Sequence, residues 1–120
     1  MSKIINLTPH DCNIYREADD TLLLTVPASG KLARRIEMLQ HYPIEINGVE
    51  IDAASKIFME IEGLPEQIEG IIYFVSAVVA TAAWEQGRTD VVCPLKAKRD
   101  EQGHIVGTYG LSVHPSLRQK

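Results

Sequence analysis

The dipeptide Asn47-Gly48 constrains the fold of this chain more than any other local feature. It stands between two runs, residues 42–46 and 49–51, that combine apolar and β-forming residues. Asn-Gly readily adopts the positive φ angles of a type I′ turn, whose twist matches that of two antiparallel strands. The sequence therefore predicts a β-hairpin at this point, and the other elements must be arranged around it.

Further strands are predicted on both sides of the hairpin, because several apolar and β-branched runs are bounded by turn residues. These runs are residues 3–7, 13–16, 21–26, 32–39, 56–62, 71–75, 90–93 and 105–113. The acidic segment 17–20 separates two of them as a hairpin turn, and Gln102-Gly103 precedes the last one as another turn. The chain is therefore expected to consist mainly of β-strands.

One helix is predicted over residues 77–86, with Ser76 as its N-cap and Gly87 as its C-terminal stop. Alanines and valines surround this helix on nearly every side, so it has no broad polar face. Such a helix lies in the core or at a subunit interface. This observation leads us to expect a homo-oligomer, with a dimer as the minimal unit.

The chain has 120 residues and no linker or repeat, which predicts a single domain over residues 1–120. We expect an α+β fold of mainly antiparallel β-strands with one main apolar helix. Apolar residues make up 45% and charged residues 23%, as in ordinary globular proteins. The composition excludes a disordered or coiled-coil chain.

Charge and cysteine content narrow the possible partners and the compartment. The formal net charge of −4 provides no general attraction for duplex nucleic acid or an anionic membrane. Cys12 and Cys93 are too few for a disulfide framework and lack zinc-site spacing. The longest apolar run, residues 71–83, is interrupted by Ser76 and Thr81. A cytoplasmic protein without a membrane span is the expectation.

The sequence motifs of common catalytic sites are absent. There is no P-loop, dinucleotide-binding glycine fingerprint, zinc-protease motif or nucleophile elbow. His114-Pro115-Ser116 has the form used in pairs by two-histidine phosphoesterases, but no second copy occurs, so it is interpreted as a solvated terminal segment. The adjacent residues His10, Asp11 and Cys12 fit a turn better than a base and its nucleophile. We expect no enzyme activity, no cofactor and no metal.

Three residues could contact a nucleotide. Arg34 and Arg35 follow the bend at Ser29-Gly30, and a guanidinium presents a planar fork to phosphate oxygens. The alternative is that both arginines belong to a solvated strand face. Trp84, near the end of the predicted helix, could stack on a base or pack in the core, and its place before a polar loop favours partial exposure.

Several sequence blocks resemble a family of small phage and prophage proteins. The blocks occur in order over nearly the whole chain. They are Ile5-Asn6-Leu7-Thr8-Pro9-His10-Asp11, residues 27–34, Glu62-Gly63-Leu64-Pro65, Ile72-Tyr73-Phe74-Val75-Ser76 with Val79-Ala80, residues 88–94, and Arg99-Asp100-Glu101-Gln102-Gly103 with Ile105. The pattern resembles the first Thoeris anti-defence family, phage proteins that sequester cyclic ADP-ribose-type signals and, in some members, cyclic oligonucleotides of the CBASS type.

This resemblance implies a ligand pocket built from an aromatic residue at a helix end, a proline loop and arginines. The matching positions are Trp84, Pro94 and Arg34, and the resemblance also implies dimers or hexamers. Leu95 replaces the polar residue usual after the loop proline, and Tyr109 stands where an arginine is expected. These two replacements imply a narrower or altered ligand choice.

The sequence therefore leads to a non-enzymatic phage protein that holds a cyclic nucleotide immune signal in the host cytoplasm. Arg34, Arg35, Trp84, Pro94 and Tyr109 are its predicted ligand-binding residues. Sequestration acts by mass action and needs no reaction. Two other classes stay open at this point: a hydrolase of the same signal, and a phage structural or regulatory interaction protein that docks through the apolar helix.

Overall fold

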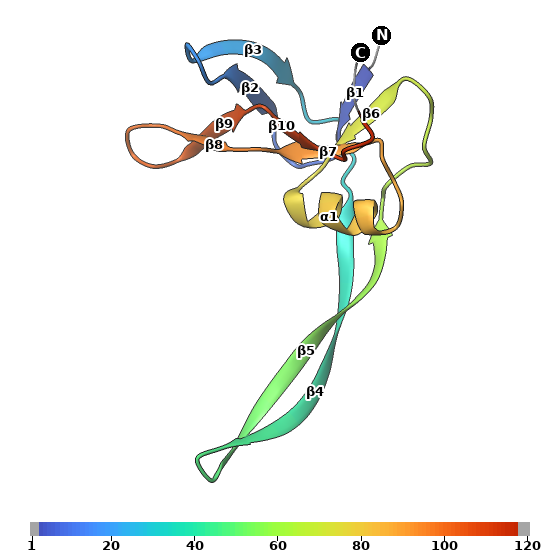
Figure 1. Ribbon diagram of the computed structural model, residues 1–120, viewed down its shortest axis with the longest axis vertical. Coiled ribbons are helices and arrows are strands. Elements are labelled where there is room, and N and C mark those ends of the chain that lie inside the picture. The colour runs from blue at the N-terminus through green and yellow to red at the C-terminus, as the bar shows by residue number, and fades with distance from the viewer. Residues whose placement is uncertain (1–2, 118–120) are drawn as a thin grey trace.

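A computed structural model describes residues 3–117 and confirms the α+β fold, with many strands and one helix (Figure 1). The elements in chain order are β1 (Lys3–Asn6), β2 (Cys12–Arg16), β3 (Thr21–Val26), β4 (Arg34–Ile46), β5 (Val49–Glu62), β6 (Ile71–Phe74), α1 (Ala77–Glu85), β7 (Val91–Pro94), β8 (Ala97–Arg99), β9 (Ile105–Tyr109) and β10 (Leu111–Val113). Helix α1 is nine residues long, and no helix within residues 3–117 could cross a membrane.

The strands form two four-stranded sheets and one separate hairpin. The first sheet has the order β1-β6-β7-β10, in which β1, β6 and β7 are parallel and β10 is antiparallel to β7. The second sheet has the order β3-β2-β9-β8 and is also mixed, since β2 and β9 run parallel. The expected antiparallel hairpins are present, but the predicted strand over residues 105–113 is divided at Gly110 into β9 of the second sheet and β10 of the first. The parallel pairs are an addition that local sequence patterns did not predict.

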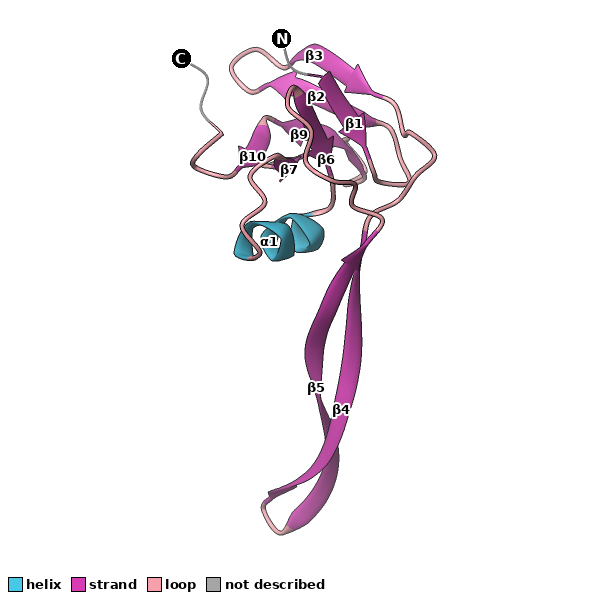
Figure 2. Ribbon diagram, turned by 90° about the vertical axis from the view of Figure 1, so that its right-hand side faces the viewer, coloured by secondary structure: helices cyan, strands magenta, loops and turns pink. Residues whose placement is uncertain are grey.

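The first sheet is the middle of three layers, with α1 on one face and the second sheet on the other (Figure 2). Alternation along its strands explains this arrangement. Tyr73 and Val91 pack with α1 in one core cluster, whereas Phe74 and Val92 pack with Ile14 of β2 in the other. A strand with both faces covered has a continuous apolar sequence. The runs in β6 and β7 therefore mark the buried centre of the protein.

Helix α1 belongs to the core, which was one of the two places expected for it. Val79, Ala80 and Ala83 are buried in a core cluster with the first sheet, and Ala82 is buried as well. Ser76 occupies the N-cap position, but its side chain makes no capping hydrogen bond. Gly87 follows the helix with φ of 89°, as the predicted stop requires. The side of α1 that faces the first sheet is therefore covered within one chain, whereas Ala77, Val78, Thr81 and Glu85 are exposed.

The hairpin β4–β5, called the arm below, projects from the body (Figures 1 and 2). Asn47 and Gly48 have φ angles of 52° and 79°, which confirms the predicted turn. The predicted runs 32–39 and 56–62 continue into this hairpin and lengthen its strands to 13 and 14 residues. The radius of gyration is 17.9 Å, against about 14 Å for a compact domain of this length.

Candidate functional site: a cleft at the ends of the parallel strands

A cleft of about 470 Å³ lies where the three parallel strands end. Thr8 and His10 follow β1, Ser76 follows β6, and Pro94 is the last residue of β7; all four line the cleft. Side chains that follow neighbouring parallel strands meet at one edge of a sheet, which is the usual ligand site of such sheets. The volume is within the range of small-molecule sites.

The N-terminus of α1 opens into this cleft at Ser76. The first intrahelical bond runs from the Ala80 N–H to the Ser76 carbonyl, so the N–H groups of the preceding turn have no acceptor within the helix. Those groups and the helix dipole favour an anion. Because the Ser76 hydroxyl does not cap the helix, it is also available to a ligand.

The loop that carries His10 and Asp11 is held by the buried side chain of Asn6. Asn6 is 1% exposed, and its amide group donates to the carbonyls of His10 at 2.8 Å and Val26 at 3.0 Å. Its oxygen accepts from the Thr8 N–H at 2.9 Å and from the Thr8 hydroxyl at 2.6 Å. The amide thus bonds through all its groups, and this wall of the cleft is preorganised.

Asp11 at the same wall accepts a hydrogen bond from the Ala28 N–H at 2.8 Å. A carboxylate accepts hydrogen bonds and does not donate, so its chemistry suits a ligand hydroxyl such as that of a ribose. Cys12 also lines the cleft, and burial raises the pKa of its thiol. A protonated thiol is a poor nucleophile, so Cys12 serves as a small apolar wall residue.

The opposite wall comes from β9 of the second sheet and is closely packed. A Cβ atom on Gly107 would lie 2.5 Å from the Asn13 carbonyl oxygen and 2.7 Å from the Tyr15 ring, so only glycine fits. Thr108 is 1% exposed and its hydroxyl accepts from the Leu95 N–H at 3.1 Å. That bond fixes the chain just after Pro94.

The remaining lining is apolar. It includes Phe74, Val75, Ile105 and Val106. Ile105 is 62% exposed and Val106 is 37% exposed, so these two side chains border the opening. Apolar walls with a few convergent polar groups are typical of small-molecule sites. The cleft can accept a flat apolar ring between its walls and an anionic group at the helix N-terminus.

Of the predicted ligand-binding residues, only Pro94 lines the cleft. Arg34 lies at the base of the arm, where it forms an exposed ion pair with Glu62 at 3.1 Å. Arg35 Nε lies 3.0 Å from Glu37 Oε1 in an ion pair without hydrogen-bond geometry, and its guanidinium lies over the Phe58 ring at 4.8 Å. The two arginines thus have different partners.

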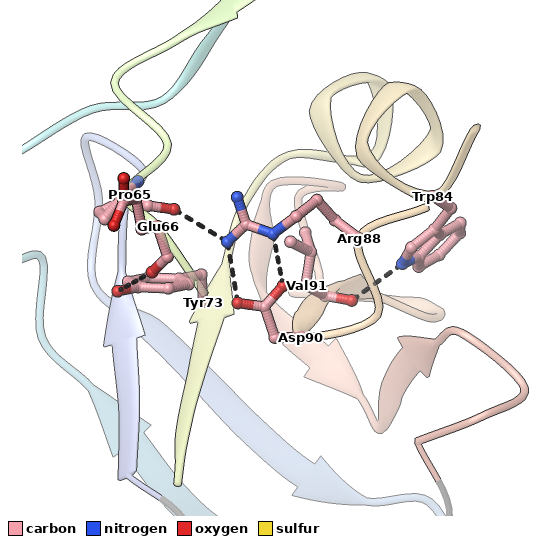
Figure 3. Close-up of polar contacts among 7 residues, drawn as sticks. All are labelled: Pro65, Glu66, Tyr73, Trp84, Arg88, Asp90 and Val91. Carbon is pink, nitrogen blue, oxygen red and sulfur yellow. Dashed lines mark hydrogen bonds and ion pairs between the residues drawn. The ribbon is translucent and has the colours of Figure 1, made fainter. Parts of the chain in front are cut away.

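Trp84 lies toward the other end of α1 from the cleft. Its indole N–H donates to the Val91 carbonyl at 2.9 Å, and the ring packs partly buried against the core (Figure 3). In the same view, Arg88 binds Asp90 through two hydrogen bonds of 2.9 and 3.0 Å and donates to the Pro65 carbonyl at 2.8 Å. These contacts join the α1–β7 loop to the segment after the arm.

Tyr109 belongs to a third location, a cluster on the second sheet. Its hydroxyl donates to Asp20 at 2.8 Å, and Lys98 lies 5.5 Å from its ring centroid and 4.6 Å from that of Tyr15. Hydrogen bonds from Lys98 and Tyr109 lower the pKa of Asp20, and the pKa of Lys98 is raised mainly by its hydrogen bond to Asp20. The five predicted residues are therefore not brought together in one chain, and their roles stay predictions.

Sequence reasoning missed the cleft residues His10, Ser76 and Thr108 as a group. Their common signal is local: two of them follow a short apolar strand and the third lies near the end of another strand. The parallel pairing of β1 with β6 brings His10 and Ser76 together and joins residues about 68 positions apart, as in Lys3 with Ile71. Thr108 is placed by a second distant pairing, that of β2 with β9, in which it lies opposite Ile14. No local pattern specifies such a pairing.

Comparison with known proteins found no matching family model, no matching curated protein and no matching solved structure.

Proposed function

We propose that this protein binds and sequesters a cyclic nucleotide immune signal without cleaving it. The ligand is a cyclic ADP-ribose isomer or a cyclic oligonucleotide. The observation that carries this function is the cleft of about 470 Å³ into which the N-terminus of α1 opens. Such a cleft suits a ligand that combines a phosphate with an apolar ring.

Each part of the ligand has a partner in the cleft. The phosphate lies at the first turn of α1 beside Ser76, and the base lies against the exposed apolar side chains of β9, Ile105 and Val106. Asp11 accepts from a ribose hydroxyl. The sequence blocks that resemble the Thoeris anti-defence family are the basis for the proposed biological setting, a phage protein that keeps an immune effector inactive by removing its signal.

Two substitutions that add the same charge to α1 test the phosphate position. Ser76→Asp places a carboxylate at the cleft, where it caps the helix but repels an anionic ligand. Thr81→Asp is the matched control, because Thr81 is exposed on the same helix and does not line the cleft. We expect Ser76→Asp to weaken binding at least about tenfold while the melting temperature stays equal or rises. Thr81→Asp is expected to bind like the wild type.

Calorimetric titration with cyclic ADP-ribose isomers and cyclic di- and trinucleotides measures these affinities. Mass spectrometry of the ligand released by heating then identifies what was held. Intact nucleotide supports sequestration, whereas a cleaved product favours a hydrolase that uses His10 and Asp11. A folded protein that binds none of these nucleotides contradicts the proposed function and favours an interaction protein.

A further inference from the structure

One face of the arm is apolar and faces solvent. Strand alternation and the β4–β5 register place Tyr42, Ile44 and Ile46 opposite Ala53, Ile51 and Val49 on this face. The larger side chains there are substantially exposed: Tyr42 is 45% exposed, Ile46 50% and Val49 59%. This set, together with Met38 and Ile57 nearer the body, is called the apolar face of the arm.

The opposite face of the arm is polar. Its cross-strand pairs include Glu45 with Glu50 and Pro43 with Asp52, and Leu39 faces Lys56. The arm is therefore an amphipathic two-stranded sheet. The two core clusters include only residues at its base, among them Ile61.

An isolated two-stranded hairpin is at best marginally stable in water. Three or more strands, or packing of one face, are needed for independent stability. An arm of 13 and 14 residues per strand with solvent on both faces lacks that support. An apolar face of this extent on one side of an otherwise polar ribbon marks a surface that another molecule covers.

We propose that the apolar face of the arm packs against the same face of a second copy of this chain, related by a two-fold axis. Two such ribbons form a small two-layer sandwich, with apolar side chains inside and the carboxylates of Glu45, Glu50 and Asp52 outside in solvent. One polar pair, Gln40 with Ser55, interrupts this face between Met38 and Tyr42, and the Ser55 hydroxyl is hydrogen-bonded to the Tyr42 hydroxyl at 2.8 Å. The face carries no charged residue from Met38 to Ile57, so two copies do not repel each other there. Dimerisation through the arm is independent of the nucleotide site.

The size of the face agrees with this occupant. The apolar face extends over residues 38–46 of β4, which span about 30 Å, and a two-stranded ribbon is about 10 Å wide. Two such faces give about 600 Å² of flat area, and projecting side chains raise the accessible surface toward the lower end of stable interfaces, about 1,200 Å². A lipid surface is a poorer occupant, because insertion of the tip brings Glu45 and Glu50 to the membrane.

Sedimentation velocity of the full chain and two lysine variants tests the dimer. Ile44→Lys places a charge in the apolar face, whereas Ala54→Lys adds the same side chain to an exposed position on the polar face. We expect a wild-type dimer at micromolar concentration, a dimer for Ala54→Lys, and a shift of at least tenfold toward monomer for Ile44→Lys.

Backbone hydrogen exchange on the same proteins separates dissociation from misfolding. In Ile44→Lys the amides of residues 34–62 are expected to exchange faster while those of β6 and β7 keep their protection. A wild-type protein that is monomeric overturns the inference. A monomer that associates with lipid vesicles overturns it as well, because the apolar face then has a different occupant. A wild-type dimer that Ile44→Lys leaves intact, with its arm equally protected, also overturns it and moves the interface to another surface.

Discussion

At the scale of single residues, Asn6 illustrates how one buried amide organises a binding cleft. Its donors and its acceptor join β1, the loop before β2 and the end of β3, through His10, Thr8 and Val26. A buried amide with all its groups bonded fixes a single arrangement of the surrounding backbone. The position of His10 at the cleft therefore follows from the side chain four residues before it.

Asn6→Asp is expected to lower the free energy of unfolding by about 3 kcal/mol at neutral pH. The substitution keeps the shape but replaces the two N–H donors with an acceptor that faces the carbonyls of His10 and Val26. Asn13→Asp is the matched control, because its amide makes an exposed bond to the Val106 carbonyl at 3.2 Å, and it should cost less than about 1 kcal/mol. Chemical denaturation measures both; equal losses contradict the role given to Asn6.

At the scale of elements, α1 and the arm have opposite surroundings. Helix α1 buries most of its valines and alanines in the body, whereas the longer strands of the arm have most of their side chains in solvent. The arm joins the body where Gly63 lies against the segment before β4. A Cβ atom on Gly63 would lie 2.1 Å from the Leu32 carbonyl oxygen, so the junction depends on glycine.

Gly63→Ala and Gly48→Ala distinguish two costs of replacing a glycine. One is the strain of a positive φ angle, and the other is the collision of the new Cβ atom with neighbouring backbone. Both glycines have positive φ, at 84° and 79°, but nothing lies within 4 Å of a Cβ atom on Gly48. Gly48→Ala should cost about 1 kcal/mol from backbone conformation alone. Gly63→Ala should cost about 3 kcal/mol or more, because the backbone must also move away from Leu32.

Thermal and chemical unfolding of the two alanine variants measures this difference. In hydrogen exchange, Gly48→Ala should reduce the protection of backbone amides in the arm, and Gly63→Ala should reduce it at the junction with the body. Similar costs for the two variants contradict the close contact at Gly63.

At the scale of the whole molecule, the protein is a three-layer body with a projecting arm. Both core clusters lie in the body, and the arm contributes to them only at its base. The Arg88–Asp90 pair adds a polar connection, since Arg88 also reaches the Pro65 carbonyl beyond the arm (Figure 3). The body therefore contains the contacts that hold its own layers together.

Removal of the outer arm should leave the body folded and able to bind its ligand. Residues 40–55 can be replaced by Asn-Gly, because the flanking Leu39 and Lys56 are direct cross-strand partners. We expect a monomer with the near-ultraviolet circular dichroism of Trp84 retained and with unchanged nucleotide affinity. Loss of the Trp84 signal contradicts an independently folded body.

Several elements can be located from short stretches of sequence, because the information that defines them is local. Asn47-Gly48 defined a turn through its positive φ angles, and Ser76 and Gly87 marked the limits of α1. Alternation and turn residues located most strands, and the absence of a polar face on residues 77–86 indicated burial. Each of these depends on the conformational preference of a few neighbouring residues, which a sequence displays directly.

Which strands are neighbours, and hence where the cleft lies, follows from the folded arrangement of the whole chain and not from any short stretch of sequence. The parallel pairs β1–β6 and β6–β7 bring His10, Ser76 and Pro94 to one edge, although the pairs connect distant segments. The folded arrangement also leaves Trp84, Arg34 and Tyr109 in separate surroundings. Pairing between distant strands is decided by the packing of whole faces, and no short run of residues contains that information.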